Sequence, residues 1–242
     1  MKKTDYLKQV SDKETAIIID LLRKVLVRGV SGDVVEFGCY RGDTSLLIEK
    51  ELEKADAKNS EIISNSEASV ERRGFWIYDS FEGLPAKTKE DASVAGDGFS
   101  EGELLISKRE VVERFKKTGL RVPRVRKGFF ENLDPGKISA SGEVLRSSAD
   151  IPDKICFAFL DGDLYQSIKT SLELVAPRLV RDETGKIQSV IIVHDYNNPQ
   201  LPGVAKAVDE WLANFDRVTN DVAAPKTAPR LQRRESLAII SW

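Results

Sequence analysis

The chain of 242 residues has few cysteines, a single histidine and no long apolar run. Its two cysteines, Cys39 and Cys156, form no Cys-x-x-Cys pair, which argues against a disulfide framework and favours a reducing compartment. No stretch approaches the roughly 18 apolar residues of a membrane span. The first residues lack the apolar core of a signal peptide. We therefore expect a cytoplasmic protein with no membrane partner.

An excess of charge of one sign is also absent. Lys and Arg number 37 against 39 Asp and Glu, so the net charge is −2. This balance gives no general attraction to nucleic acid or to anionic lipid, and we expect neither as a partner. Hydrophobic residues make up 41% of the chain, which suffices for a large core. Without a linker or a repeat, residues 1–242 are predicted to form one domain.

The hydrophobic pattern alternates between short apolar runs and helical periodicity. This alternation predicts an α/β fold with a mostly parallel sheet and helices on both of its faces. An N-terminal helical segment covers residues 1–30, and the long polar stretch at 85–103 is predicted to be a lid loop. We expect strands at 33–37, 75–78, 121–126, 155–160, 186–193 and 235–242, and helices at 11–28, 43–54, 101–118, 163–179 and 204–215. Polar segments at 55–73 and 134–153 are expected to be surface insertions.

The first candidate site is the segment VVEFGCYRGD at residues 34–43. An apolar strand carries an acid, Glu36, near its end. Two glycines four residues apart, Gly38 and Gly42, follow the strand and lead into a helix. Glycines at such a turn let the backbone approach a ligand closely. The spacing is not the GxGxxG of dinucleotide sites, and Tyr40 stands where a middle glycine would. An acid two residues before the first glycine is typical of methyltransferases, although an ordinary strand-to-helix turn would show the same pattern.

The second candidate is Asp79, which closes the strand predicted at 75–78. In doubly wound sheets a carboxylate at this position can accept both ribose hydroxyls of a nucleotide. The alternative interpretation is a simple turn cap.

The third candidate is a group of polar residues after two buried strands. Asp161 and Asp163 follow one strand, and His194 and Asp195 follow the next. Adjacent parallel strands end at the same edge of the sheet, so these side chains should converge. Their negative charge needs compensation, and a divalent cation, by default Mg²⁺, would provide it. Separately solvated helix caps, with His194 packed as a structural residue, are the alternative.

Together these motifs resemble the macrocin O-methyltransferase family. The matching segments span residues 33–212 in order and comprise VVEFGCYRGDTS, YDSFEGLP, KGFFENL, FLDGDLYQS and VHDYNNPQLPGVAKAVDEW. The resemblance implies a Rossmann-like class I methyltransferase with a seven-stranded sheet. It implies S-adenosylmethionine as cofactor, transfer of a methyl group to a hydroxyl, and a homodimer. A sugar of a glycosylated metabolite or polysaccharide is the first expected acceptor, and a phenolic or catechol-like molecule is the second.

The resemblance also implies residue roles. Asp161, His194 and Asp195 would hold the cation, and Asp163 would be the general base. Better-studied relatives carry two acids where this chain has His194 and Asp195, so Mn²⁺ or Zn²⁺ becomes more plausible beside Mg²⁺. The departure also leaves two alternatives open, that His194 is a catalytic base or that the site holds no metal. The residues implied to line the cofactor site are Glu36, Gly38, Tyr40, Arg41, Asp79, Ser80, Phe130 and Asp161.

Two other functional classes are weighed against this one. A nicotinamide-dependent oxidoreductase is disfavoured, because the chain lacks both GxGxxG and a Tyr-x-x-x-Lys pair. A noncatalytic protein that binds a nucleotide or S-adenosylmethionine is disfavoured as well, since it has no need for the acids at 161, 163 and 195.

Overall fold

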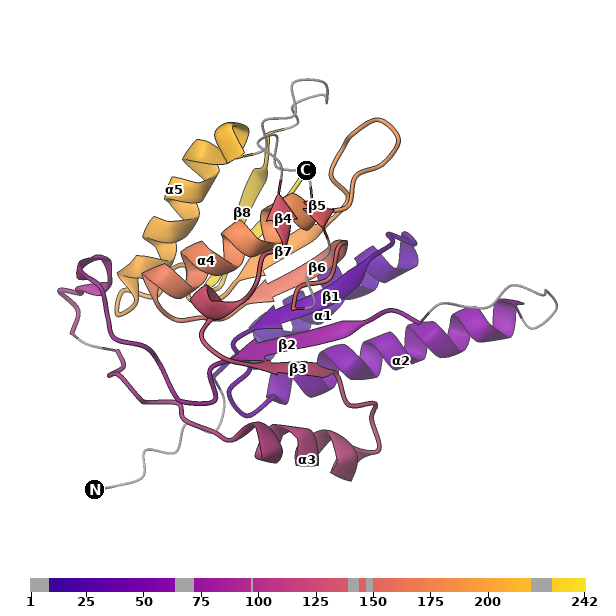
Figure 1. Cartoon of the computed structure of the whole chain (residues 1–242), viewed down its shortest axis with the longest axis horizontal. Helices are drawn as coiled ribbons and strands as arrows, with labels where there is room; N and C mark the ends of the chain where they lie inside the picture. Colours follow the sequence, from indigo (N-terminus) through magenta and orange to yellow (C-terminus); the bar gives the residue numbers. More distant parts are fainter. Residues whose placement is uncertain (1–8, 64–71, 97, 139–143, 147–149, 219–227) are drawn as a thin grey trace.

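The computed structural model describes residues 9–63, 72–96, 98–138, 144–146, 150–218 and 228–242. Within them a seven-stranded sheet runs in the order β3-β2-β1-β6-β7-β9-β8 (Figure 1). Its strands are β1 (Asp33–Phe37), β2 (Phe75–Asp79), β3 (Arg124–Lys127), β6 (Ile155–Leu160), β7 (Val190–Val193), β8 (Arg230–Arg234) and β9 (Leu237–Ser241). The first five are mutually parallel, and β9 is antiparallel to both of its neighbours.

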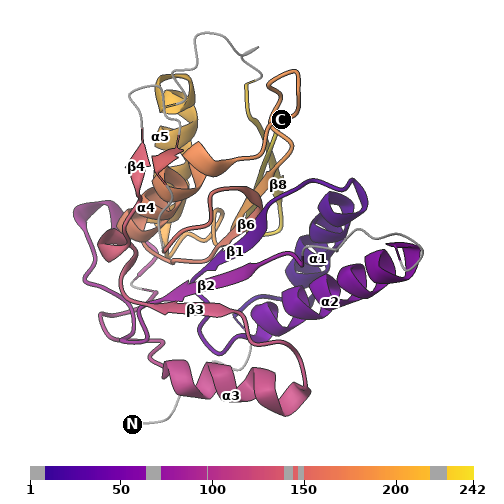
Figure 2. The same cartoon turned by 45° about the vertical axis from the view of Figure 1, so that its right-hand side comes forward.

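Helices cover both faces of the sheet, as Figure 2 shows from a second direction. The long helices are α1 (Asp12–Val27), α2 (Asp43–Ile63), α3 (Lys108–Thr118), α4 (Tyr165–Val175) and α5 (Pro202–Val218). Short 3-10 turns lie at η1 (Lys89–Asp91), η2 (Phe130–Asn132) and η3 (Ala176–Arg178), and a small hairpin pairs β4 (Lys137–Ile138) with β5 (Val144–Arg146). The predicted fold class is therefore confirmed, including the helices on two faces.

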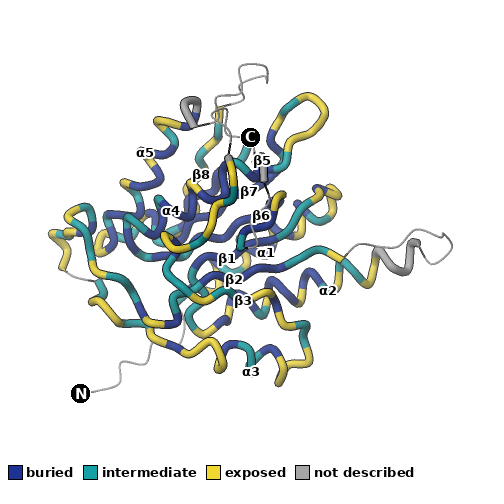
Figure 3. The backbone as a smooth tube through the Cα atoms, viewed as in Figure 1, coloured by how far each residue is buried: buried dark blue, intermediate teal, exposed yellow. Residues whose placement is uncertain are grey.

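Two hydrophobic layers hold the helices to the sheet, because successive strand residues point to opposite faces. On β6, Ala158 and Leu160 pack toward α4 and α5, whereas Phe157 and Phe159 pack toward α1, α2 and α3. Every residue of β6 is buried, as expected for a central strand of a parallel sheet, and Figure 3 shows the buried centre of the sheet.

The register of the parallel strands brings their carboxyl ends into line. Phe37 pairs with Leu160 on one side and with Tyr78 on the other, and Leu160 pairs with Val193. The next residue of each strand therefore lies at one edge of the sheet. Backbone hydrogen bonds continue this alignment one residue past the strands. The N–H of Asp161 donates to the carbonyl oxygen of Phe37, and the N–H of His194 donates to that of Leu160.

Several element boundaries differ from the predictions. Helix α2 extends to Ile63, so the segment at 55–73 begins as helix, and its residues 64–71 lie outside the described part. Helix α3 begins at Lys108 rather than at 101, because Ser107 and Glu110 form a capping box there. Strand β8 was not predicted, since its sequence RLQRR lacks the apolar alternation of a half-buried strand.

The segment after β2, predicted as a lid, is bonded to the start of α4 through Asp91. The buried carboxylate of Asp91 accepts hydrogen bonds from the N–H of Thr88 at 2.9 Å and the N–H of Tyr165 at 2.7 Å. Tyr165 is the first residue of α4, whose own N-cap residue makes no side-chain cap bond. Asp91 therefore caps a helix that lies far away along the chain. Whether the segment moves as a lid stays a prediction.

The described residues contain no helix long and apolar enough to cross a membrane.

Candidate active site

The turn after β1 brings the backbone against the neighbouring strand. Gly38 has φ 84°, and a Cβ built on it would lie 2.0 Å from the carbonyl oxygen of Asp161. Only glycine avoids this contact, so the residue is fixed by packing as well as by its left-handed backbone. Tyr40 also has a positive φ, of 44°, which is costly for a residue with a side chain. Strained backbone at a sheet edge is typical of binding sites.

Asp79 holds this turn from the end of β2. Its Oδ2 accepts the N–H groups of Cys39 at 2.9 Å and Tyr40 at 3.2 Å, and its Oδ1 accepts the N–H of Phe81 at 2.8 Å. A carboxylate accepts about four hydrogen bonds, so Asp79 keeps capacity for one further donor, on Oδ1. The residue therefore shapes the turn and can still contact a ligand hydroxyl.

Glu36 presents an unpaired carboxylate oxygen inside the site. The residue is 1% exposed, and its Oε2 has no hydrogen-bond partner among the described residues. Burial raises the pKa of Glu36 to about 8; Ser45 opposes this shift, while Asp161 and Asp79 add to it. A buried carboxylate without a partner is costly unless a cationic ligand or a proton compensates it.

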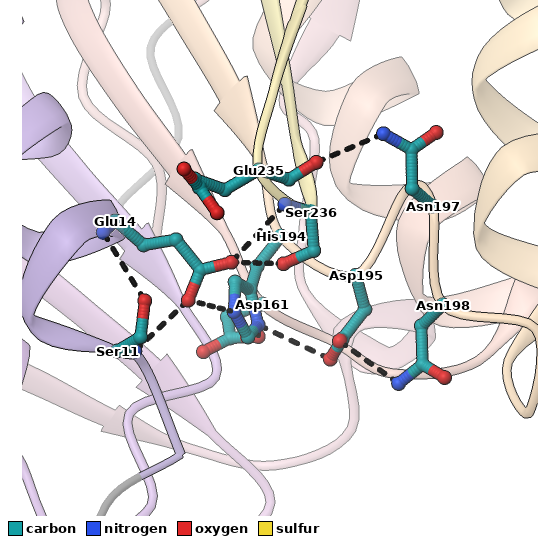
Figure 4. A network of polar contacts seen from close by, with 9 residues as sticks. All are labelled: Ser11, Glu14, Asp161, His194, Asp195, Asn197, Asn198, Glu235 and Ser236. Carbon is teal, nitrogen blue, oxygen red and sulfur yellow. Dashed lines mark hydrogen bonds and ion pairs between the residues drawn. The ribbon is translucent and has the colours of Figure 1, made fainter.

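His194 follows β7 and is surrounded by three carboxylates, as Figure 4 shows. Two of them lie at the ends of β6 and β7, and the third comes from α1. Its Nδ1 lies 2.8 Å from Oδ1 of Asp161 and 3.1 Å from Oδ2 of Asp195. Its Nε2 faces Glu14 of α1 at 3.7 Å. The Asp195 carboxylate is steadied on its other oxygen by the side-chain amide of Asn198 at 3.0 Å.

The electrostatics of this cluster favour a positive charge at its centre. Burial alone would lower the pKa of His194, but the carboxylates of Asp161, Asp195 and Glu14 outweigh it and raise the pKa well above its ordinary value. The contact with His194 is the largest cause that lowers the pKa of Glu14. A positive charge at the centre of the cluster, whether a proton on the ring or a bound metal cation, would offset the negative charge of these carboxylates.

Asp163 lies two residues beyond Asp161 with a left-handed φ of 60°. Burial, followed by the charges of Asp161 and Asp195, raises the pKa of Asp163 well above its usual range. A carboxylate with a raised pKa is a stronger base than an exposed one. Asp163 therefore lies in the pocket next to Asp161, and its role as general base stays a prediction.

One pocket of about 1130 Å³, including solvent at its mouth, is lined by the β1 and β2 turns and by Asp161, Asp163, His194 and Asp195. Every residue that the sequence analysis proposed for the site lines it: Glu36, Gly38, Tyr40, Arg41, Asp79, Ser80, Phe130, Asp161, Asp163, His194 and Asp195. Phe130 packs edge-on against Phe37 with ring centroids 5.1 Å apart. The predicted convergence is thus present in the structure, whereas the roles of the individual residues stay predictions.

The sequence analysis assigned residues 1–30 to a helical segment but named none of them as site residues. Gln9, Val10, Asp12 and Thr15 also line the pocket, and Glu14 contacts His194. Ser11 and Glu14 form a capping box at the start of α1, which accounts for Glu14 by a local bond and gives no hint of a distant partner.

The donor set fits a divalent cation. Asp161, His194 and Asp195 each offer one ligand atom, and these atoms all lie within 4.8 Å of one another. Cations bound about 2.1 Å from their ligands place neighbouring octahedral donors about 3 Å apart. The distances of 2.8 and 3.1 Å from Nδ1 to the two carboxylate oxygens are compatible with that spacing. Two oxygens and one nitrogen suit Mn²⁺ or Zn²⁺ as well as Mg²⁺.

Fold and site together define the class I S-adenosylmethionine-dependent methyltransferases. The structural match with the O-methyltransferase NovP covers 95% of this chain and 79% of the NovP chain, with a TM-score of 0.66 and 24% sequence identity. The match with CalS11, a calicheamicin methyltransferase, covers 96% of this chain and 81% of the CalS11 chain, with a TM-score of 0.60 and 17% sequence identity. The chain belongs to the family described as Macrocin-O-methyltransferase (TylF), whose profile matches residues 10–225. The family predicted from the motifs is therefore confirmed.

Two curated relatives are similar in sequence. The first is 8-demethyl-8-(2,3-dimethoxy-alpha-L-rhamnosyl)-tetracenomycin-C 4'-O-methyltransferase of Streptomyces olivaceus, 31% identical over 64% of this chain. The second is demethyldecarbamoylnovobiocin O-methyltransferase of Streptomyces niveus, 28% identical over 79% of this chain. The matches span 51% and 62% of the lengths of these relatives.

Proposed function

We propose that this protein is an S-adenosylmethionine-dependent O-methyltransferase that acts on a sugar hydroxyl of a glycosylated small molecule, assisted by a divalent cation. The observation that carries the proposal is the single pocket in which Glu36, Asp79, Asp163 and His194 meet at the ends of four adjacent strands. The name of one relative supports a sugar acceptor, because its substrate is a rhamnosyl-tetracenomycin C, and the other relative is named for demethyldecarbamoylnovobiocin.

The cofactor end of the pocket is formed by the β1 and β2 turns. Glu36 would pair with a cationic group of the cofactor through its free oxygen, and Asp79 would accept a ribose hydroxyl on Oδ1. Phe130 would lie next to the adenine of the cofactor, while Tyr40 and Arg41 would lie toward its methionine end. When bound, S-adenosylmethionine supplies an electrophilic methyl group on its sulfonium.

The acceptor end of the pocket is formed by the carboxylate cluster. Asp163 would take the proton of the acceptor hydroxyl, while the oxygen gains the methyl group. Asp161, His194 and Asp195 would hold a divalent cation, which supplies charge that favours the alkoxide form of the hydroxyl. Residues 9–15 would contact the rest of the acceptor, since several of them line the same pocket.

The experiment is an assay of methyl transfer with a panel of acceptors. Purified protein is incubated with S-adenosylmethionine, Mg²⁺ or Mn²⁺, and glycosylated metabolites that carry free sugar hydroxyls, and products are followed by mass spectrometry. We expect a monomethylated product whose formation stops on addition of EDTA and resumes with excess Mn²⁺. Activity on catechols alone would replace the sugar by a phenolic acceptor. Full activity in EDTA would remove the cation from the proposal.

The variant Asp163→Asn tests the base. It keeps the size of the side chain but removes its ability to take a proton, so turnover should fall by about 10² to 10⁴-fold. Cofactor affinity, measured by calorimetry, should change little. Retained turnover would exclude Asp163 as the base.

A further inference from the structure

We infer that Glu14 is a positioning residue that holds the His194 ring with Nδ1 free to bind a cation between Asp161 and Asp195. The inference rests on the proposed cation site and adds to it a residue from the N-terminal helix. Glu14 belongs to α1, about 180 residues before His194 in sequence, and both side chains are almost fully buried.

The two nitrogens of the His194 ring face different groups (Figure 4). Nδ1 is directed at Asp161 and Asp195, at 2.8 and 3.1 Å. Nε2 is directed at Oε2 of Glu14, at an ion-pair distance of 3.7 Å. The ring therefore spans from α1 to the ends of the central strands.

Glu14 is itself held on both carboxylate oxygens. Oε2 accepts the N–H of Ser11 at 2.9 Å, within the capping box of α1. Oε1 accepts the N–H of Ser236 at 3.2 Å and also its hydroxyl, in the turn between β8 and β9. Donors from the start of α1 and from the β8–β9 turn thus fix the carboxylate, and it presents a stationary negative charge to the ring.

This arrangement decides which ring nitrogen can act as a ligand. A metal-bound histidine uses the lone pair of one nitrogen, and the N–H of the other usually donates to a carboxylate or carbonyl. The carboxylates of Asp161 and Asp195 beside Nδ1 would otherwise attract the hydrogen of a neutral ring to that atom. The negative charge of Glu14, 3.7 Å from Nε2, offsets them by favouring the hydrogen on that nitrogen, which leaves the Nδ1 lone pair for a cation.

The experiment is a titration of the full chain with MnCl₂ by calorimetry. The variant Glu14→Gln keeps the size of the side chain and can still close the capping box. It should weaken Mn²⁺ binding by about 10 to 100-fold, as loss of a supporting carboxylate typically does. The matched control is Glu110→Gln, at the same capping-box position of α3 and outside the pocket, which should bind Mn²⁺ like the wild type.

A double-mutant cycle separates positioning from a purely structural effect. His194→Asp replaces the ring by a third carboxylate, so Glu14 then has no ring to orient. On that background Glu14→Gln should cause no loss of Mn²⁺ affinity. An equal loss with and without the ring would overturn the inference, as would unchanged Mn²⁺ affinity of Glu14→Gln in the wild-type background.

Two further outcomes are distinguishable. If wild-type protein binds S-adenosylmethionine but no Mn²⁺, the proposed cation site fails and the inference fails with it. If Glu14→Gln does not fold, Ser236→Ala serves in its place, since it removes one donor that holds Glu14. We expect a severalfold loss of Mn²⁺ affinity for Ser236→Ala on the wild-type background and none on His194→Asp. Unchanged affinity in the first case would contradict the inference.

Discussion

Cofactor affinity should fall steeply as the pH is lowered from 8 to 6, because Glu36 must be ionised to pair with a cationic cofactor. With a pKa of about 8, Glu36 is half ionised at pH 8. Only about one molecule in 100 carries the charge at pH 6, so the apparent affinity should drop about 50-fold. At pH 6, binding of one S-adenosylmethionine should release nearly one proton.

Calorimetry in two buffers with different ionisation enthalpies measures both the affinity and the released proton. The variant Glu36→Gln should bind more weakly than the wild type at pH 8 and show little dependence on pH. If the affinity of the wild-type protein is flat between pH 6 and 8, with no proton released, Glu36 does not contact a cationic group of the cofactor.

The same pKa has a consequence for the stability of the free protein. The pKa of Glu36 rises from an ordinary 4.5 to about 8 on folding. Across that pH window the folded chain holds a proton that the unfolded chain has released, so stability falls as the pH rises. The full effect is about 5 kcal/mol, from about 1.4 kcal/mol per unit of pKa shift. Urea unfolding at pH 5 and pH 8 should show a smaller difference for Glu36→Gln than for the wild type.

Two further predictions concern residues that shape the site. Gly38→Ala should lower the free energy of unfolding by more than about 2 kcal/mol, since left-handed backbone strain adds to a contact with the carbonyl of Asp161; an unchanged urea midpoint would contradict this. Asp91→Ala should cost about 1 to 3 kcal/mol through the unpaired N–H groups that it leaves. It should also speed hydrogen exchange at Thr88 and Tyr165, and unchanged exchange there would show that Asp91 does not fasten the segment.

Much of the site could be predicted because it follows from strand ends. Asp161 and His194 each follow the last residue of a buried strand, and the apolar runs before them are unmistakable. Once two such strands are parallel neighbours, their following residues must lie side by side. The same reasoning places Gly38 and Asp79, so the convergence of these groups needed no knowledge of side-chain packing.

Other features could not be read from local patterns. Glu14 satisfies a capping box within three residues, so its local role hides its contact with His194. The strand Arg230–Arg234 is an edge strand whose side chains are mostly exposed, and it therefore carries no hydrophobic signal. The capping of α4 by Asp91 joins residues 74 positions apart, which no spacing rule anticipates.

The bonds from Glu14 to Ser236 tie together positions 222 residues apart. During synthesis the strands that carry Asp161 and His194 leave the ribosome well before the turn that contains Ser236. The carboxylate of Glu14 is therefore held on both of its oxygens only after the β8–β9 hairpin has formed. The ends of the central strands are thus synthesised before the last contact that completes the surroundings of His194.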